Sequence, residues 1–126
     1  MSETPENIQT RTFNFACDLI GFLRNENLKE EAGRVILRQL LRSGTSIGAN
    51  LEEASAGQSK ADFISKSNIA LKEARETYYW LRLLKRTIIP NSSKLEELLD
   101  ESRQITAILT VIVKKAGQSL NRQKVR

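Results

Sequence analysis

Apolar residues recur every three or four positions along most of the chain, and this period predicts amphipathic α-helices. Four such stretches are expected, at about residues 12–25, 28–56, 59–87 and 93–117. Short polar breaks separate them, and the last break contains Pro90. The alternation typical of a β-strand is not sustained anywhere. The pattern therefore predicts an all-α fold, an up-down-up-down four-helix bundle with short connections.

Polar residues at the helix starts predict the caps. Thr12 is the expected N-cap of the first helix. Ser59 with Asp62, and Ser93 with Glu96, have the spacing of capping boxes at the starts of the third and fourth helices. Gly57 is expected to end the second helix.

The expected boundaries divide the chain into three parts. Residues 1–11 are predicted to be a disordered N-terminal segment, residues 12–117 the bundle domain, and residues 118–126 a basic C-terminal tail. The N-terminus is polar and has no signal-peptide core, and no apolar run approaches membrane-spanning length. A cytoplasmic location is therefore expected.

The fourth stretch carries an unusually wide apolar stripe, which predicts contact with more than one neighbour, including another subunit. Its members are Leu95, Leu98, Leu99, Ser102, Ile105, Ile108, Leu109, Ile112, Val113 and Ala116. On the third stretch, Tyr79 and Trp80 are the expected anchors of an oligomer interface, where aromatic residues are enriched. A homo-oligomer follows from these features.

Small and polar residues replace bulky ones between positions 43 and 50. Ser46, Gly48 and Ala49 leave little side-chain volume, so we expect a close helix crossing at Ala49. A polar motif combines one face of the second stretch with two carboxylates of the third: Ser43, Ser46, Asn50, Glu53, Glu73 and Glu76. It is either a ligand pocket or a hydrogen-bonded network that fixes helix register, and the latter is favoured because buried polar groups must be paired.

Composition removes most catalytic chemistry. The chain has no histidine and a single cysteine, Cys17, which is expected to be a buried small residue. The commonest general base and the usual zinc ligands are thus absent. No phosphate-binding loop, dinucleotide fingerprint or catalytic triad is present. We expect no enzyme activity, no catalytic residue, no metal, no cofactor and no small-molecule substrate.

Charge points to polyanions. The net charge is +5, but residues 1–33 hold three basic and six acidic side chains, whereas residues 34–126 hold 17 basic and nine acidic ones. Arginines recur along helical faces, in one place beside Tyr79, where a base can stack while cations hold phosphate. The candidate nucleic-acid-binding residues are Arg34, Arg38, Arg42, Arg75, Arg82, Lys85, Arg86, Lys114 and Lys115. A solvated basic face with no partner remains the alternative.

The pattern of Ser43, Ser46-Ile47, Ala49-Asn50, Glu53, Ser59, Asp62-Phe63, Ala70, Glu73, Glu76 and Trp80-Leu81 resembles a known family. It is the small bacterial four helix bundle family, whose founding members are encoded in intervening sequences of 23S ribosomal RNA genes. The likeness runs from about Phe13 to Ala116. It implies a four-helix bundle, a homo-pentameric ring, and a non-enzymatic role associated with RNA or other nucleic acid.

The sequence therefore favours a non-catalytic homo-oligomeric bundle that presents a basic surface to nucleic acid, chiefly structured RNA. Two alternatives stay open. One is a protein-binding scaffold whose basic face meets an acidic partner. The other, suggested by the family's resemblance to accessory proteins of diversity-generating retroelements, is a basic ring that assists a reverse transcriptase and its RNA.

Overall fold

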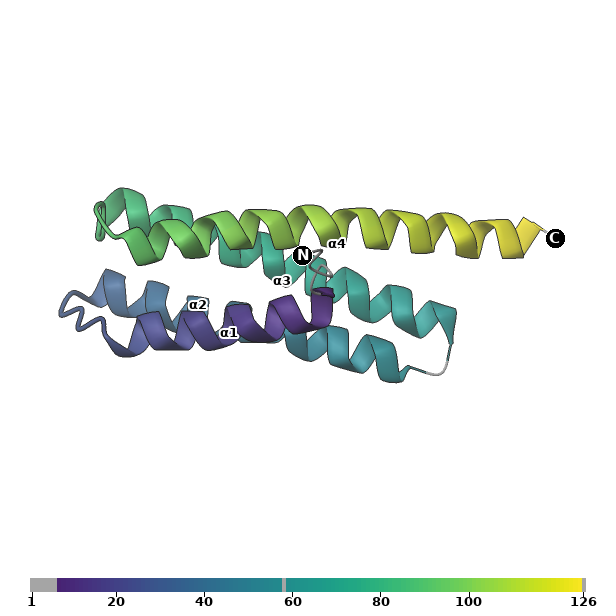
Figure 1. Ribbon diagram of the computed structural model, residues 1–126, viewed down its shortest axis with the longest axis horizontal. Helices are drawn as coiled ribbons and strands as arrows, with labels where there is room; N and C mark the ends of the chain where they lie inside the picture. Colours follow the sequence, from purple (N-terminus) through teal and green to yellow (C-terminus); the bar gives the residue numbers. More distant parts are fainter. Residues whose placement is uncertain (1–6, 58, 126) are drawn as a thin grey trace, which may run out of the picture.

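The computed structural model describes residues 7–57 and 59–125, with side chains up to residue 122, and these residues form four helices. They are α1 (Ile8–Arg24), α2 (Glu31–Ala56), α3 (Lys60–Thr87) and α4 (Ser93–Val125). No strand occurs among the described residues. The helices pack as an antiparallel bundle (Figure 1), so the predicted all-α four-helix fold is confirmed.

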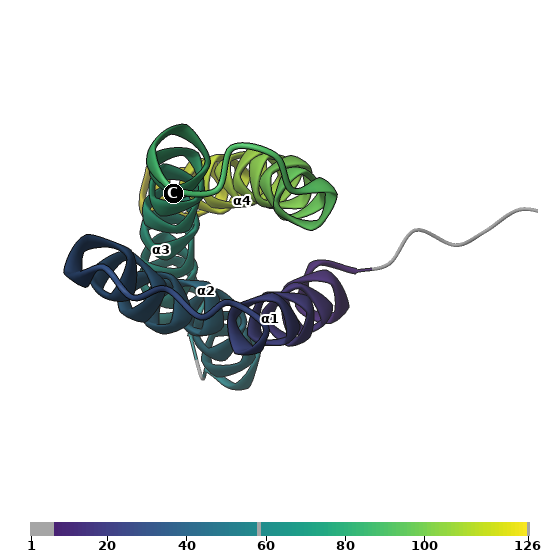
Figure 2. The ribbon, with the colours of Figure 1, turned by 90° about the vertical axis from the view of Figure 1, so that its left-hand side faces the viewer.

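Seen along its axis, the bundle has its helices in chain order, each beside the next (Figure 2). The pair α2 and α3 makes the most extensive contact. The first and last helices, α1 and α4, also pack against each other. Within the described ranges, the backbones of the diagonal pairs, α1 with α3 and α2 with α4, do not approach each other closely. Short connections force this neighbour order, because each helix must fold back on the one before it.

The four helices differ in length, and α1 extends along only about half of the long axis of the bundle (Figure 1). The C-terminal part of α4 runs on past the start of α1, beside α3. There Ile112 and Val113 of α4 are partly buried against the core, while Val111 is half exposed.

The core follows the predicted stripes. Its buried apolar side chains are Phe15, Leu19, Phe22, Ile36, Leu40, Ile47, Leu51, Ala70, Leu71, Ala74, Leu81, Leu84, Leu95, Leu98, Ile105 and Leu109. On α3, Thr77 is also buried, and Tyr78 lies at the edge of the core. Of the wide stripe on α4, Leu95, Leu98, Ser102, Ile105 and Leu109 are fully buried, and the other members are partly exposed.

Two of the predicted caps are wrong. The first helix begins at Ile8, because Asn7 Oδ1 accepts a hydrogen bond from the Thr10 amide at 2.8 Å. Thr12 is instead buried inside the helix, where its hydroxyl donates to the Ile8 carbonyl. The fourth helix is capped by Ser92, whose Oγ accepts from the Leu95 amide, and not by Ser93.

The other helix ends agree with expectation or extend it. Ser59 Oγ accepts from the Asp62 amide, as predicted, and Gly57 follows the last residue of α2. Residues 8–11, expected to be disordered, belong to α1, and residues 118–125, expected to be a tail, continue α4. The remainder of the predicted N-terminal segment, residues 1–6, lies outside the described residues.

The close helix crossing exists, but not at Ala49. A Cβ on Gly44 would lie 2.1 Å from Leu19 Cδ2, and a Cβ on Gly48 would lie 3.2 Å from Thr12 Oγ1. The two glycines therefore let α1 approach α2. Ala49 is exposed and lines an open groove between these helices, so its predicted position was wrong. Cys17 is likewise exposed, contrary to expectation, because it lies on the outer side of α1.

Candidate functional site

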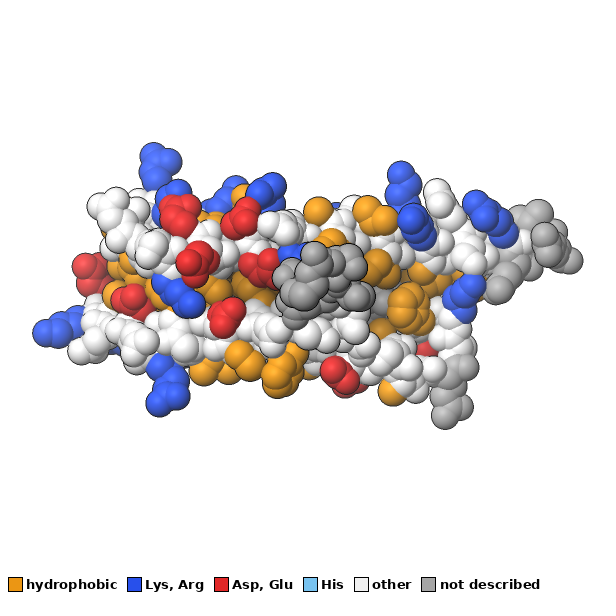
Figure 3. All heavy atoms as spheres, in the orientation of Figure 1, with side chains coloured by type: hydrophobic (Ala, Val, Ile, Leu, Met, Phe, Trp, Pro, Cys, Tyr) orange, Lys and Arg blue, Asp and Glu red, His pale blue; other side chains and the backbone are white. Residues whose placement is uncertain are grey.

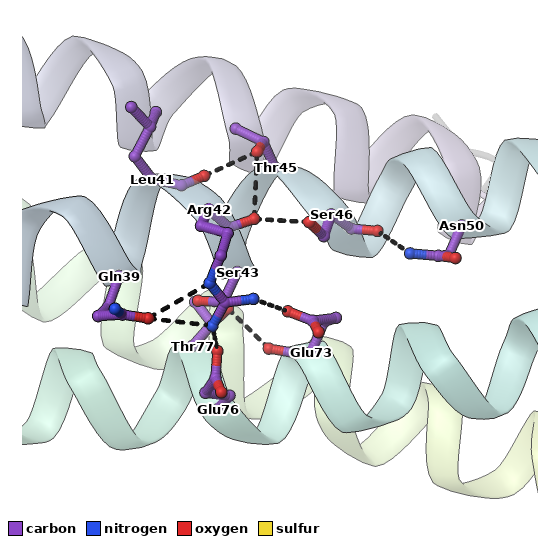
Figure 4. Close-up of polar contacts among 10 residues, drawn as sticks. All are labelled: Gln39, Leu41, Arg42, Ser43, Thr45, Ser46, Asn50, Glu73, Glu76 and Thr77. Atoms are coloured by element: carbon purple, nitrogen blue, oxygen red, sulfur yellow. Dashed lines mark hydrogen bonds and ion pairs between the residues drawn. The ribbon is translucent and has the colours of Figure 1, made fainter.

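Arg42 joins α2 to α3 through two carboxylates (Figure 4). Its guanidinium forms an ion pair with Glu73 at 3.1 Å and another with Glu76, and Gln39 Oε1 accepts from the same group at 3.2 Å. The Glu73 side chain is only 15% exposed. A carboxylate this buried needs a partner, so the positive charge of Arg42 is largely committed within the chain.

Next to Arg42, Ser43 and Thr77 meet in the core between the same two helices (Figure 4). Their hydroxyl oxygens lie 2.9 Å apart, and Thr77 Oγ1 also lies 2.8 Å from the Glu73 carbonyl. Both side chains are fully buried. The pair therefore satisfies two polar groups that would otherwise be costly to bury, and it fixes how α2 and α3 slide against each other.

The remaining members of the polar motif do not converge on one point. Ser46 donates to the Arg42 carbonyl, and Asn50 donates to the Ser46 carbonyl, so both bond within α2. Glu53 forms an ion pair with Lys66 at 2.8 Å, farther along the α2–α3 contact. The structure thus brings Ser43, Glu73 and Glu76 together and spreads the others along the helix contact.

The basic ridge predicted on α2 is also engaged by carboxylates. Arg34 and Arg38 both lie beside Glu31, at 2.9 and 3.5 Å. The hydrogen bond and the charge of Arg34, with a smaller contribution from Arg38, lower the pKa of the Glu31 carboxyl below its usual value. These arginines are well exposed, but each shares its charge with an acid of its own helix.

The outer side of α3 is different. Lys72, Arg75, Arg82 and Arg86 are exposed there at helical spacing, and within the described part of the chain none of them has a carboxylate partner. We call these four residues the α3 basic stripe. Tyr79, which is 49% exposed, lies among them. The Arg82 guanidinium lies over the rings of Tyr78, at 5.0 Å, and Tyr79, at 6.0 Å.

An open cavity of about 540 Å³ lies between α3 and α4 at one end of the stripe. Tyr78, Arg82 and Arg86 line it from α3, and Leu99 lines it from α4. Lys85, predicted to bind nucleic acid, pairs at this cavity with Glu96 at 2.6 Å. This cavity could not be predicted from the sequence, because the pairing of α3 with α4 decides its position.

The last two predicted cations, Lys114 and Lys115, are exposed on α4 beyond the start of α1, with no carboxylate partner among the described residues. Charge is divided along this face (Figure 3): most acidic side chains in view lie where α1 and α4 are neighbours, and the C-terminal half of α4 shows lysine and arginine. The seam between α1 and α4 includes Asp18, Glu97 and Glu101.

The comparisons with known proteins agree with this architecture. The family model described as 23S rRNA-intervening sequence protein matches residues 7–111. The chain belongs to the 23S rRNA-intervening sequence protein family. A crystal structure of a protein with unknown function from the S23 ribosomal protein family, from Bacteroides thetaiotaomicron, is 44% identical. It covers 86% of this chain and 99% of its own, with a TM-score of 0.76. No curated protein matches the chain.

The residues matched in the 23S rRNA-intervening sequence protein family include all of α1, α2 and α3, and α4 up to Val111. The Arg42 cluster, the buried hydroxyl pair and the α3 basic stripe all lie within this match. Lys114 and Lys115 lie outside it. The resemblance inferred from the residue pattern is therefore confirmed.

Apolar side chains are exposed in more than one place. Phe13 of α1 is 64% exposed, and Ile20 of α1 and Leu41 of α2 are also exposed. Figure 3 shows hydrophobic side chains gathered along the lower edge of the molecule, beside α1 and α2. On α3, Tyr79 is half exposed, whereas Trp80 is partly buried and its ring contacts Tyr79 at 5.1 Å.

The described residues lack two features. They contain no helix that is long and apolar enough to cross a membrane. They also contain no group of three or more cysteine, aspartate or glutamate side chains arranged to hold a metal ion.

Proposed function

We propose that the chain is a non-catalytic homo-oligomeric bundle that presents a basic surface to nucleic acid, chiefly to structured RNA. The observation that carries this proposal is the α3 basic stripe. Its four cations are exposed and lack carboxylate partners among the described residues, in contrast to those on α2. Uncommitted cations are the ones that gain most by meeting phosphates.

The stripe has a length that suits a nucleic-acid backbone. From Lys72 to Arg86 the helix rises by about 21 Å at 1.5 Å per residue, which spans several successive phosphates. Tyr79 adds an exposed ring between the cations. Because the stripe consists of cations around one ring, we expect recognition of shape and charge more than of sequence.

Self-association is part of the same proposal. Phe13, Ile20 and Leu41 expose apolar surface on α1 and α2, and Val111 exposes it on α4. Two separate apolar areas on one chain favour a ring, because each subunit then uses one area for each neighbour. A ring of five copies, as the family resemblance implies, would place five stripes on one particle and multiply the positive field.

The test is the salt dependence of RNA binding. Changing all four stripe residues to glutamine should flatten the slope of log affinity against log salt by roughly one unit for each lost phosphate contact. The matched control changes Arg24, Lys29, Lys66 and Lys94 to glutamine. The control variant loses the same number of positive charges, but at exposed or ion-paired positions outside the stripe. Its slope of log affinity against log salt should therefore stay close to that of the wild type.

Light scattering on each variant separates binding from assembly. The wild-type protein should give a multiple of 14.3 kDa, with five copies expected. If the wild-type protein shows no salt-sensitive binding to RNA or DNA near 50 mM salt, the nucleic-acid proposal is wrong. If the stripe variant loses its oligomeric mass, the stripe is a subunit interface, and a protein-binding scaffold becomes the better proposal.

A further inference from the structure

We infer that the cavity between α3 and α4 binds one unpaired nucleotide of the RNA, with the base inside and the phosphate at its mouth. This inference rests on the proposed function and names the form of RNA that the surface prefers. It concerns a single place, the end of the α3 basic stripe near the α3–α4 connection.

The cavity has the size and the open side that such a ligand needs. Its volume is about 540 Å³, which is within the range of small-molecule sites. Leu99 and Pro90 supply apolar surface on the α4 side and at the connection, and Tyr78 supplies a ring from α3. Tyr78 and Leu99 are both partly buried, so this surface is formed before a ligand arrives.

The cations at the cavity are arranged for both parts of a nucleotide. The Arg82 guanidinium lies over the Tyr78 ring, 5.0 Å from its centroid, and is thus held at the cavity, where rings and guanidinium planes can stack on a base. Arg86 has no carboxylate partner among the described residues and lies at the same cavity. It is therefore available to a phosphate.

Among the described residues that line the cavity, the one carboxylate does not oppose an anion. Glu96 is paired with Lys85 at 2.6 Å, which balances its charge. Of the residues lining the cavity, Arg82 and Arg86 then contribute net positive charge. Both also belong to the α3 basic stripe, so a strand that follows the stripe reaches the cavity without leaving the cationic surface.

A duplex cannot use this cavity in the same way. Bases within a helix are stacked on both faces, whereas bases in loops, bulges and single strands can turn outward and stack on aromatic rings or guanidinium planes. The structure therefore predicts a preference for RNA with unpaired nucleotides over a blunt duplex of the same charge.

The experiment compares two labelled RNAs by fluorescence anisotropy at 50 mM salt, an eight-nucleotide single strand and a blunt duplex that contains it. Tyr78→Leu should weaken single-strand binding by roughly tenfold and leave duplex binding unchanged, because only the strand loses a stacking partner. Tyr78→Phe keeps the ring and should bind as the wild type does. Arg86→Gln should weaken single-strand binding more than Lys66→Gln, the control, which removes a charge about 30 Å away along α3.

A second measurement does not depend on the variants folding. Single strands that carry 4-thiouridine should crosslink to the segment between residues 78 and 99. Crosslinks confined to other segments, or equal losses of strand and duplex binding in Tyr78→Leu, would overturn the inference and leave the proposed function intact. If the wild type binds neither RNA, both proposals fall together.

Discussion

Three glycines on α1 and α2 offer a graded test of how closely these helices pack. Alanine is favoured over glycine inside a helix by about 1 kcal/mol. At Gly21 the new Cβ would meet no atom within 4 Å, so Gly21→Ala should stabilise the protein by about that amount. At Gly44 the same Cβ would lie 2.1 Å from Leu19 Cδ2, well inside contact distance.

The cost at Gly44 follows from the burial of its neighbour. Ordinary carbon contacts lie at about 3.5–4.0 Å, so the Leu19 methyl group would have to move by more than about 1 Å. Leu19 is fully buried, and its movement displaces other core atoms. Overpacking of this kind costs about 1–3 kcal/mol, which offsets or exceeds the gain in helix propensity. Gly44→Ala should therefore be neutral to destabilising by about 2 kcal/mol.

Gly48→Ala should fall between the two, because its Cβ would lie 3.2 Å from Thr12 Oγ1 and needs a smaller adjustment. The assay is urea unfolding followed by circular dichroism, at one protein concentration because self-association shifts apparent stability. The expected order of stability is Gly21→Ala, then Gly48→Ala, then Gly44→Ala. If Gly44→Ala were as stable as Gly21→Ala, the close approach of α1 to α2 would be refuted.

Three further expectations concern helix ends and polar contacts. Ser92→Ala should lower the free energy of unfolding by about 1 kcal/mol and Ser93→Ala should change it little, since only Ser92 caps α4. Thermal unfolding of the two variants checks this, and equal effects would contradict it. Thr77→Val should lower the free energy of unfolding by about 1–3 kcal/mol, because it leaves the buried Ser43 hydroxyl unpaired. Adding Ser43→Ala should recover part of this loss, and a double-mutant cycle measures the recovery. Arg42→Gln should lower the free energy of unfolding by about 1–2 kcal/mol, and by less at high salt, because Glu73 and Glu76 lose their counterion. An unchanged urea unfolding curve would show that the ion pairs contribute nothing to stability.

The helical period predicted the core well, because each stripe has one possible partner, the interior of the bundle. Leu81 and Leu84 are examples: their spacing alone places them inside, and both are fully buried. Helix ends were predicted less accurately. Asn7 and Ser92 are as good caps as Thr12 and Ser93, and the choice between neighbours depends on where packing begins.

The candidate site was harder to predict than the fold. Spacing shows that Arg42 and Arg82 lie on helical faces, but it does not show which carboxylates face them on another helix. The register of α2 against α3 places Glu73 and Glu76 beside Arg42, whereas Arg82 meets a tyrosine ring. Two arginines of similar appearance in sequence therefore differ in how much of their charge is available.

The end of α4 shows a related limit. The fourth helix was expected to end at about residue 117, a glycine, yet it continues to Val125. A glycine costs only about 1 kcal/mol within a helix, and the residues after it are mostly acceptable helix formers. The unfavourable helix propensity of one glycine was therefore outweighed by the summed helix propensity of the residues around it.

The short span of α1 has a consequence for motion within the bundle. Where α1 is present, four helices share the core, and beyond its start at Ile8 only α2, α3 and α4 continue among the described residues. Local opening is easiest where the fewest apolar contacts must be broken. Amide hydrogens near Val111 and Ile112 should exchange with solvent sooner than those near Leu98 and Ser102. The molecule should therefore loosen from one end, in steps, while the half that contains α1 stays closed.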